Sequence, residues 1–192
     1  NTIMMSIDPK AVPKDVFEML EMTNRTAEEV FSLLDNLLKW TKSQLGKLSN
    51  VPQSVDVVGL VEGVIEVFNP IAESKSIVLA LNSSVEFVNV NVIVDIEMIK
   101  SVVRNLLSNA IKFSHKDTTI TIQVEIRNIP DSSDQEVVIT VCDKGCGIKE
   151  EDQPKLLNEA THFTTFGTNS EEGSGLGLLL CKDFVSKNHG KL

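Results

Sequence analysis

The chain has 192 residues, 42% of them hydrophobic, enough for the core of one large domain or of one domain with an accessory element. Eighteen lysines and arginines stand against 27 aspartates and glutamates, and the net charge of −9 argues against nucleic acid and anionic membranes as partners. No apolar run approaches the roughly 20 residues of a membrane span and no signal peptide is visible, so we expect no membrane contact by this chain.

The first 50 residues are predicted to be helical. Residues 1–7 have the pattern of a helix end, stopped at Asp8-Pro9, and Pro13 suits the first turn of the next helix. Apolar or small residues then recur at steps of four and three, a heptad pattern, at Val16, Leu20, Thr23, Ala27, Val30, Leu34, Leu37, Thr41, Leu45 and Leu48. Such a stripe needs a partner, either the chain's own second part or a helical-hairpin dimer forming a four-helix bundle, and we favour the bundle.

The second part follows a predicted linker at residues 49–52, where the helical pattern breaks. Periodicity predicts helices over 57–73 and 95–113, and strands over 77–81, 87–94, 119–127 and 136–142, with a hairpin loop at 129–134. The strands come in hairpins without βαβ alternation. We therefore expect an α+β fold, a two-layer α/β sandwich with a mixed, mostly antiparallel sheet under helices, rather than a doubly wound fold.

The helix over 95–113 carries an unusual polar stripe. Asn105, Asn109 and Lys112 fall within roughly 60° of one another on a helix that is otherwise largely apolar. Buried amides need hydrogen-bond partners, so the stripe by itself fits a pair of satisfied or exposed polar residues as well as it fits a binding site.

Two glycine clusters follow, at 143–148 (DKGCGI) and 173–178 (GSGLGL). Glycines let the backbone approach a ligand closely, and the free N–H groups of a helix start hold phosphate oxygens, so the second cluster is placed for phosphate. Neither cluster matches the P-loop or the dinucleotide fingerprint, and either one alone could be a turn or a helix cap. Asp143, at a strand end beside an open glycine turn, could accept a hydrogen bond from the exocyclic amine of a purine.

Three cysteines, Cys142, Cys146 and Cys181, are an odd number and are typical of reduced thiols in a cytosolic compartment. The pair at 142 and 146 lacks a second cluster or a nearby histidine. We interpret this pair as incidental rather than as a metal site.

Four segments in order resemble the boxes of a known family. Residues 105–113 (NLLSNAIKF) look like the N box, 143–148 the G1 box, 162–168 (HFTTFGT) the F box region and 173–178 the G2 box. Together they resemble the ATP-binding catalytic domain of sensor histidine kinases of two-component systems, in the GHKL superfamily with Hsp90, DNA gyrase and MutL. Residues 33–40 also resemble the second helix of that family's dimerisation hairpin.

The resemblance implies a Bergerat-type ATP-binding fold with ATP and Mg²⁺ as cofactors. Asn109 and Asn105 would hold the metal, Lys112 would lie against the phosphates, Phe113 close to the nucleotide, and Asp143 would recognise adenine. The full set of implied nucleotide-binding residues is Asn105, Asn109, Lys112, Phe113, Asp143, Gly145, Gly147, Ile148, Thr164, Thr165, Gly173, Ser174, Gly175, Leu176, Gly177 and Leu178. A mobile lid is expected over roughly 159–173, and no residue of this chain is assigned as catalytic.

The domain limits implied are 1–50 for part of the dimerisation and phosphotransfer hairpin and 51–192 for the ATP-binding domain. None of the three histidines, His115, His162 and His189, lies on the hairpin helix, and the family pattern places the acceptor histidine several residues before Asn1. The abrupt start favours a piece of a longer protein over a natural protein that has lost this histidine, and the family's sheet usually continues beyond Leu192.

The expected function is Mg-ATP-dependent phosphoryl transfer to a histidine and then to an aspartate of a response-regulator receiver domain, in a homodimer joined through the helical hairpin. The expected location is the cytoplasm, as the cytoplasmic portion of a sensor. Three alternatives stay open: a non-catalytic nucleotide-sensing module, a GHKL-type ATPase, and a plain α/β interaction domain. The ATPase alternative lacks a residue to activate water, because Asn105 stands where the Hsp90 and gyrase branch carries a glutamate base.

Overall fold

The structure is a computed structural model that describes residues 12–83, 91–130, 134–158, 164–165, 167–168 and 175–192. Several predicted features therefore lie outside the described residues: the helix end at 1–7, the start of the strand over 87–94, the middle of the 129–134 loop, and most of the lid. The chain divides into two compact units, Asn1–Leu48 and Ser49–Leu192, which are described separately.

The first unit consists of one long helix, α2 (Lys14–Gln44), which follows Pro13 as predicted. The heptad pattern runs on to Leu48, but the helix stops earlier because Gly46 takes a left-handed φ of 64°. Lys47 closes that turn by donating its N–H to Lys42 O at 2.9 Å. Large apolar side chains stay exposed along this helix, among them Met19, Met22, Val30, Phe31, Leu34 and Leu38.

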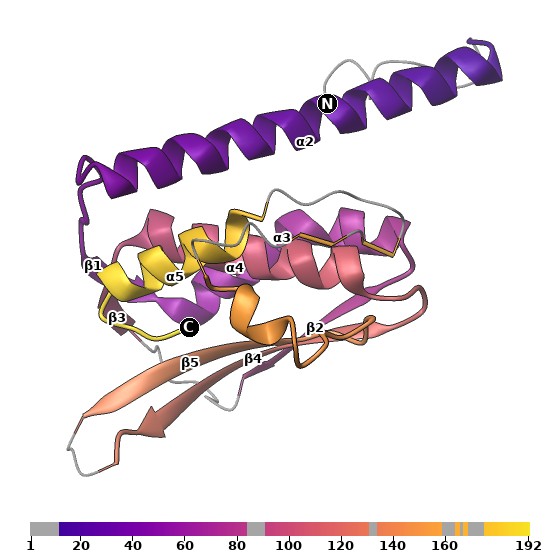
Figure 1. The fold of residues 1–192 in the computed structure, drawn as a ribbon. Coiled ribbons are helices and arrows are strands. Elements are labelled where there is room, and N and C mark those ends of the chain that lie inside the picture. Colours follow the sequence, from indigo (N-terminus) through magenta and orange to yellow (C-terminus); the bar gives the residue numbers. More distant parts are fainter. Residues whose placement is uncertain (1–11, 84–90, 131–133, 159–163, 166, 169–174) are drawn as a thin grey trace. The chain divides into compact units, whose positions relative to one another are not determined.

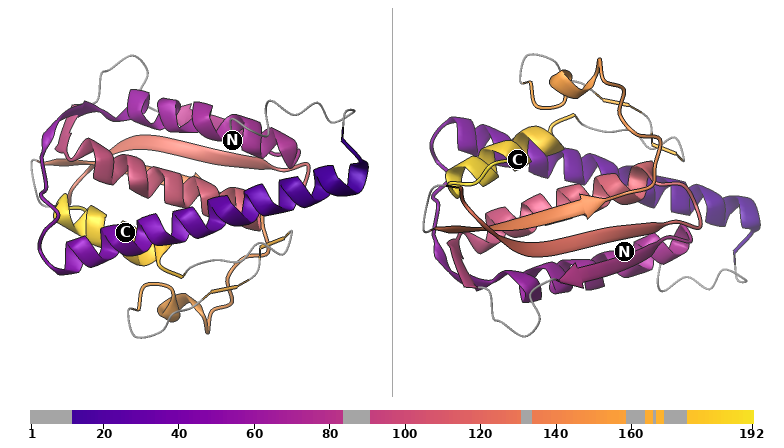
Figure 2. Two further views of the ribbon diagram at one scale, coloured as in Figure 1. Left: turned by 90° about the horizontal axis from the view of Figure 1, so that it is seen from above. Right: turned by 90° about the horizontal axis from the view of Figure 1, so that it is seen from below.

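The second unit has a layer of helices on one face of a sheet (Figures 1 and 2). The helices are α3 (Val57–Ser74), α4 (Ile96–Phe113) and α5 (Gly177–Lys187), with a short 3-10 helix, η1 (Gln153–Lys155). The main sheet has the order β2-β4-β5, formed by β2 (Val78–Ser83), β4 (Thr119–Asn128) and β5 (Gln135–Cys142). A second sheet pairs β1 (Gln53–Asp56) with β3 (Asn91–Val94).

The pairing pattern confirms the α/β sandwich and corrects its details. β4 and β5 form the predicted antiparallel hairpin, with Thr121 opposite Cys142. β2, however, pairs with β4 in parallel, and α4 lies in the connection between them, so this parallel pair of the mixed sheet is joined by a crossover that was not predicted. Side-chain alternation shows which face a strand buries but not the direction of its partner, which is why this pair was missed. β1, a four-residue strand just after the predicted linker, was also missed.

The core lies between the helices and the main sheet. Ile120, Ile122 and Val124 of β4 alternate with more exposed residues and are fully buried. They pack with the apolar faces of α3 and α4, which include Val61 and Leu107. None of the helices in the described ranges is both long enough and apolar enough to cross a membrane.

Asp95 fixes where the polar helix α4 begins. Its carboxylate oxygen Oδ1 accepts the N–H groups of Glu97 and Met98, both at 3.0 Å, which is the N-cap arrangement. Its other oxygen accepts the Val51 N–H at 2.9 Å, and its own N–H donates to Asn188 Oδ1 at 2.7 Å. One buried aspartate thus joins the N-terminal segment of the unit, α4 and the end of α5.

Candidate functional site

The polar stripe of α4 faces the start of α5 at one point. Asn105 is half-buried, and its Nδ2 donates to Ser101 O one turn earlier at 2.9 Å. Its Oδ1 lies so close to Gly177 that a Cβ on that glycine would be 2.9 Å from it. The N box and the G2 box, about 70 residues apart in sequence, therefore meet at Asn105 and Gly177.

Asn109 and Lys112 continue the stripe toward the end of α4. Asn109 is half-buried, and its amide makes no hydrogen bond with any residue that the structure describes. Neutral amide oxygens are suitable ligands for a hard cation, so Asn109 fits the donor set that Mg²⁺ takes. The Lys112 amine lies over the Phe113 ring, 4.9 Å from its centroid, a cation–π contact that holds the amine beside the helix end.

The turn after β5, which holds the G1 box, is pressed against the end of α4. Asp143 Oδ1 accepts the Gly145 N–H at 2.9 Å, which orients the carboxylate. Gly145 pairs with Ser114 in an isolated antiparallel bridge. A Cβ on Gly145 would lie 2.2 Å from the Phe113 carbonyl oxygen, so only glycine fits this approach. Gly147 has a left-handed φ of 66°, and Ile148 beside it is exposed.

The described part of the F box region is tied to the same helix end. Thr168 donates its N–H and its Oγ1 hydrogen to Lys112 O, both at 3.1 Å, and Thr168 Oγ1 also lies 2.9 Å from Ser114 O. Thr164 and Thr165, which the resemblance assigns to the site, are exposed.

The G2 box leads directly into α5. Gly175 has a φ of 68°, Leu176 is buried at the N-cap position, and Gly177 and Leu178 open the helix. The N-cap residue Leu176 makes no side-chain cap hydrogen bond to this helix start, and the first N–H groups of a helix have no acceptor within the helix itself. Gly173 and Ser174 lie outside the described residues.

Sequence reasoning missed two residues that organise this region, Lys75 and Thr168. Lys75 is buried, and its Nζ donates hydrogen bonds to the carbonyls of Ile111 and Lys112 near the end of α4. Nothing in the local pattern distinguishes it from the surface lysines that usually follow a helix. Thr168 stands in the quoted F box region, but no motif position marked it.

The Ser114 hydroxyl is buried without a hydrogen-bond partner among the described residues, which gives a testable prediction. The side chain is fully buried, and its Oγ is the buried side-chain oxygen that finds no hydrogen-bond partner in the described part of the chain. A buried hydroxyl without a partner costs about 1–3 kcal/mol. We expect Ser114→Ala to raise the free energy of unfolding by roughly 1 kcal/mol in urea titrations. A loss of stability of that size would instead show that the hydroxyl is hydrogen-bonded in solution.

The cysteines give a second expected result. Burial raises the pKa of the Cys181 thiol from 9.0 to about 12, whereas Cys142 and Cys146 are exposed. The reactive thiolate of Cys181 is therefore almost absent at pH 8 in the folded protein. We expect a thiol reagent to label two cysteines quickly at pH 8 and the third only on unfolding, as counted by mass spectrometry. Rapid labelling of all three in the native protein would contradict the burial of Cys181.

Comparisons with known proteins identify the second unit. The family described as "Histidine kinase-, DNA gyrase B-, and HSP90-like ATPase" matches residues 94–192, which hold the N, G1 and G2 boxes. Sensor protein EvgS of Escherichia coli (strain K12) is 31% identical over 175 residues, covering 91% of this chain and 14% of that protein. The chain thus spans only a small part of this relative.

Solved structures agree on the fold. The Acinetobacter baumannii histidine kinase AdeS has a TM-score of 0.65 at 20% identity, over 91% of this chain and 75% of that one. The histidine kinase ThkA in complex with the response regulator TrrA has a TM-score of 0.67 at 19% identity, over 98% of this chain and 49% of that one. At these identities the likeness speaks for the fold alone. With the matched boxes and the juxtaposed N, G1 and G2 segments, the conclusion is that this chain belongs to the histidine kinase-, DNA gyrase B- and HSP90-like ATPase family.

Proposed function

We propose that this chain is the ATP-binding part of a sensor histidine kinase, and that Mg-ATP binds along α4, between the start of α5 at Asn105 and the turn after β5 at the helix end. One observation carries the proposal. Gly145 lies against the Phe113 carbonyl, and Gly177 lies against Asn105, so that both glycine boxes close on the two ends of one polar stripe. The residues along this stripe would supply an adenine partner, a cation and helix-start N–H groups to a nucleotide.

Each chain residue has a defined part in this proposal. Asp143, oriented by the Gly145 N–H, would accept the adenine amine through its carboxylate. Asn109, with Asn105 beside it, would offer amide oxygens to Mg²⁺, which neutralises phosphate charge when bound. Lys112 would leave the Phe113 ring and turn toward the phosphates. The other residues of the nucleotide-binding set implied by the resemblance would line the same site, including Gly173 and Ser174 outside the described ranges.

The reaction we propose for the whole protein is phosphoryl transfer from ATP to a histidine, followed by transfer to a response-regulator aspartate. The sensor relatives and the ThkA–TrrA complex support it. The chain's part is positioning and charge neutralisation rather than covalent chemistry. The acceptor would come from elsewhere in the whole protein, since α2 holds no histidine and His115 and His189 are exposed on the second unit.

The partner we propose for α2 is a second copy of the chain. Exposed apolar side chains of α2 lie at heptad positions, among them Val16, Leu20, Val30, Leu34 and Leu37, and a bundle of paired helices would bury them. We also place the chain in the cytoplasm, as the cytoplasmic portion of a sensor, because ATP and receiver domains are available there. The alternative partner, the chain's own second unit, predicts a monomer in light scattering.

Calorimetry with a non-hydrolysable ATP analogue tests the proposal. We expect saturable one-site binding with Mg²⁺ and much weaker binding in excess EDTA, because the acidic protein must hold about four nucleotide charges. Radiolabelled ATP should leave no label on the chain alone. No binding of the analogue with Mg²⁺ would refute the nucleotide site, and a base-stable, acid-labile label would refute the assignment of the acceptor to another segment.

A further inference from the structure

We propose that Lys75 is a positioning residue of the nucleotide site: its buried ammonium holds the end of α4 in the place where the G1 and F box segments join it. The inference rests on the proposed function, and it adds a residue that belongs to none of the four boxes. Two contacts of Lys75 bear on the site, and both go to backbone carbonyls of α4. Lys75 acts through these backbone carbonyls, as the following contacts show.

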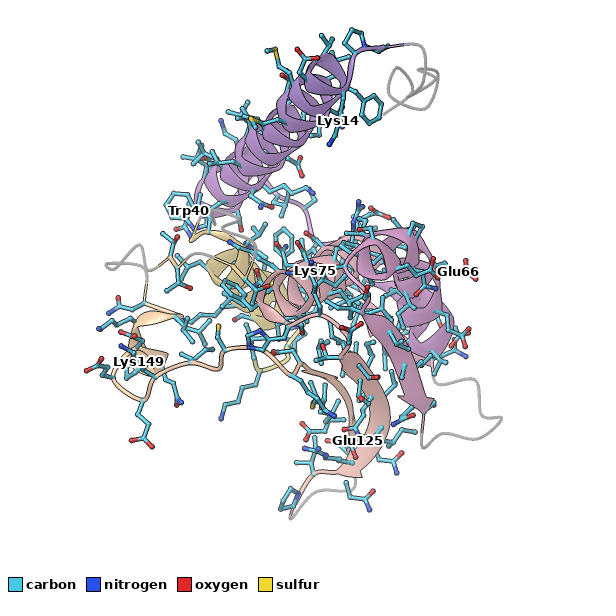
Figure 3. All side chains as sticks on the ribbon, turned by 90° about the vertical axis from the view of Figure 1, so that its right-hand side faces the viewer. Lys14, Trp40, Glu66, Lys75, Glu125 and Lys149 are labelled. Carbon is cyan, nitrogen blue, oxygen red and sulfur yellow. The ribbon has the colours of Figure 1, made fainter. Side chains whose placement is uncertain are left out.

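Lys75 is placed by the way α3 ends. It is the C-cap residue of α3, and the next residue, Ser76, takes a left-handed φ of 57°. Ile77 then returns its N–H to Ala72 O at 2.9 Å, which closes the turn. The lysine consequently enters the interior. Figure 3 shows Lys75 among the packed side chains of the helical layer, whereas Glu66 and Lys149 lie at the periphery.

The ammonium of Lys75 meets two carbonyls that α4 itself leaves unpaired. Lys75 Nζ donates to Ile111 O at 2.8 Å and to Lys112 O at 2.9 Å. The last four carbonyls of a helix have no partner within the helix, and they carry the negative end of its dipole. A cation at this point both satisfies the two carbonyls and stabilises the helix end, and an apolar side chain of similar length does neither.

The same helix end is the junction of the site. Lys112 O also accepts hydrogen bonds from the N–H and the Oγ1 hydroxyl of Thr168. This one carbonyl therefore binds both the buried Lys75 and the exposed F box residue. Two residues on, Ser114 pairs with Gly145 of the G1 turn. Lys75 therefore fixes the backbone from which Lys112 and Phe113 project and on which the two other segments are built.

The experiment compares Lys75→Met, which keeps the stem and removes the charge and donors, with Lys75→Arg, which keeps both. Val61→Ala is the matched control, because it opens a cavity in the buried core beside α3 without removing a hydrogen bond to the end of α4. For each variant we would measure stability in urea and the affinity for the Mg-bound ATP analogue by calorimetry, well below the unfolding midpoint.

We expect Lys75→Met to weaken analogue binding roughly tenfold or more, because losing a residue that holds a binding residue in place commonly has an effect of this size. Lys75→Arg should recover part of the loss. Val61→Ala should bind within about twofold of the original chain at a comparable loss of stability. Affinity unchanged in Lys75→Met, or reduced as much in Val61→Ala, overturns the inference.

Thr168→Val gives a second route should Lys75→Met fail to fold. It removes only the hydroxyl that reaches Lys112 O and Ser114 O, and we expect several-fold weaker binding. Unchanged affinity in this variant would contradict the claim that hydrogen bonds at the end of α4 position the nucleotide site. If the original chain itself binds no analogue, the proposed function fails. If it binds and the variants bind equally well, only the role of Lys75 fails.

Discussion

Replacing Asn109 with alanine is expected to weaken binding of the Mg-bound ATP analogue by roughly 10- to 100-fold. The estimate follows from the loss of one contact to a charged group, which contributes about 1.5–3 kcal/mol. Asn109 is half-buried on α4, and its amide is not engaged by the other described residues. Its removal should therefore cost little stability, and calorimetry with and without Mg²⁺ should show most of the loss in the presence of the metal.

Ser108→Ala is the control, because Ser108 is the exposed neighbour of Asn109 on the same helix and is not among the implied nucleotide-binding residues. Its affinity should equal that of the original chain. If Asn109→Ala binds the Mg-bound ATP analogue as tightly as Ser108→Ala does, the metal is held elsewhere. The polar stripe of α4 is then a set of surface polar residues without a role in binding.

Replacing Gly145 with alanine is expected to damage both the fold and the site. The new Cβ would lie 2.2 Å from the Phe113 carbonyl oxygen and 2.9 Å from Asp143 Oδ1. The helix-end carbonyl cannot move away without disturbing the adjacent Ser114–Gly145 bridge, and a shift of the carboxylate gives up its hydrogen bond from the Gly145 N–H. Overpacking of this kind costs about 1–3 kcal/mol, so we expect a lower urea midpoint and no measurable binding of the ATP analogue.

Gly63→Ala is the matched control for that substitution. Gly63 lies inside α3, and nothing comes within 4 Å of a Cβ built on it. Alanine should stabilise the helix by up to about 1 kcal/mol and leave nucleotide binding unchanged. Equal stability and equal affinity in Gly145→Ala would mean that the G1 turn moves freely away from α4, contrary to the close approach seen here.

Much of the fold could be predicted from local pattern. The helices α3 and α4 end within a residue or so of the predicted limits, and β4 and β5 match their alternating runs. β1 could not be found this way, because four residues beside a linker are too few to show a period and the strand exists through its pairing with β3. The parallel partner of β4 was missed for a related reason, since pairing is decided between distant segments.

The residues of the candidate site could likewise be predicted from the sequence, but their contacts could not. The boxes named its residues, but nothing in them says that Gly177 approaches Asn105 or that Thr168 returns to the end of α4. Lys75 shows the limit most plainly. A lysine after a helix is usually solvated, and only a left-handed turn at Ser76 sends this one inward.

The sequence by itself determined the family, the order of the boxes and the polar stripe on α4, because periodicity and glycine placement are properties of neighbouring residues. The tertiary structure alone decided which ends of those segments meet and what holds them. The carbonyls at the end of α4 need donors that the helix cannot supply, and Lys75 and Thr168 bring them from segments 37 and 56 residues away from Lys112. Contacts of that range leave no period in a sequence.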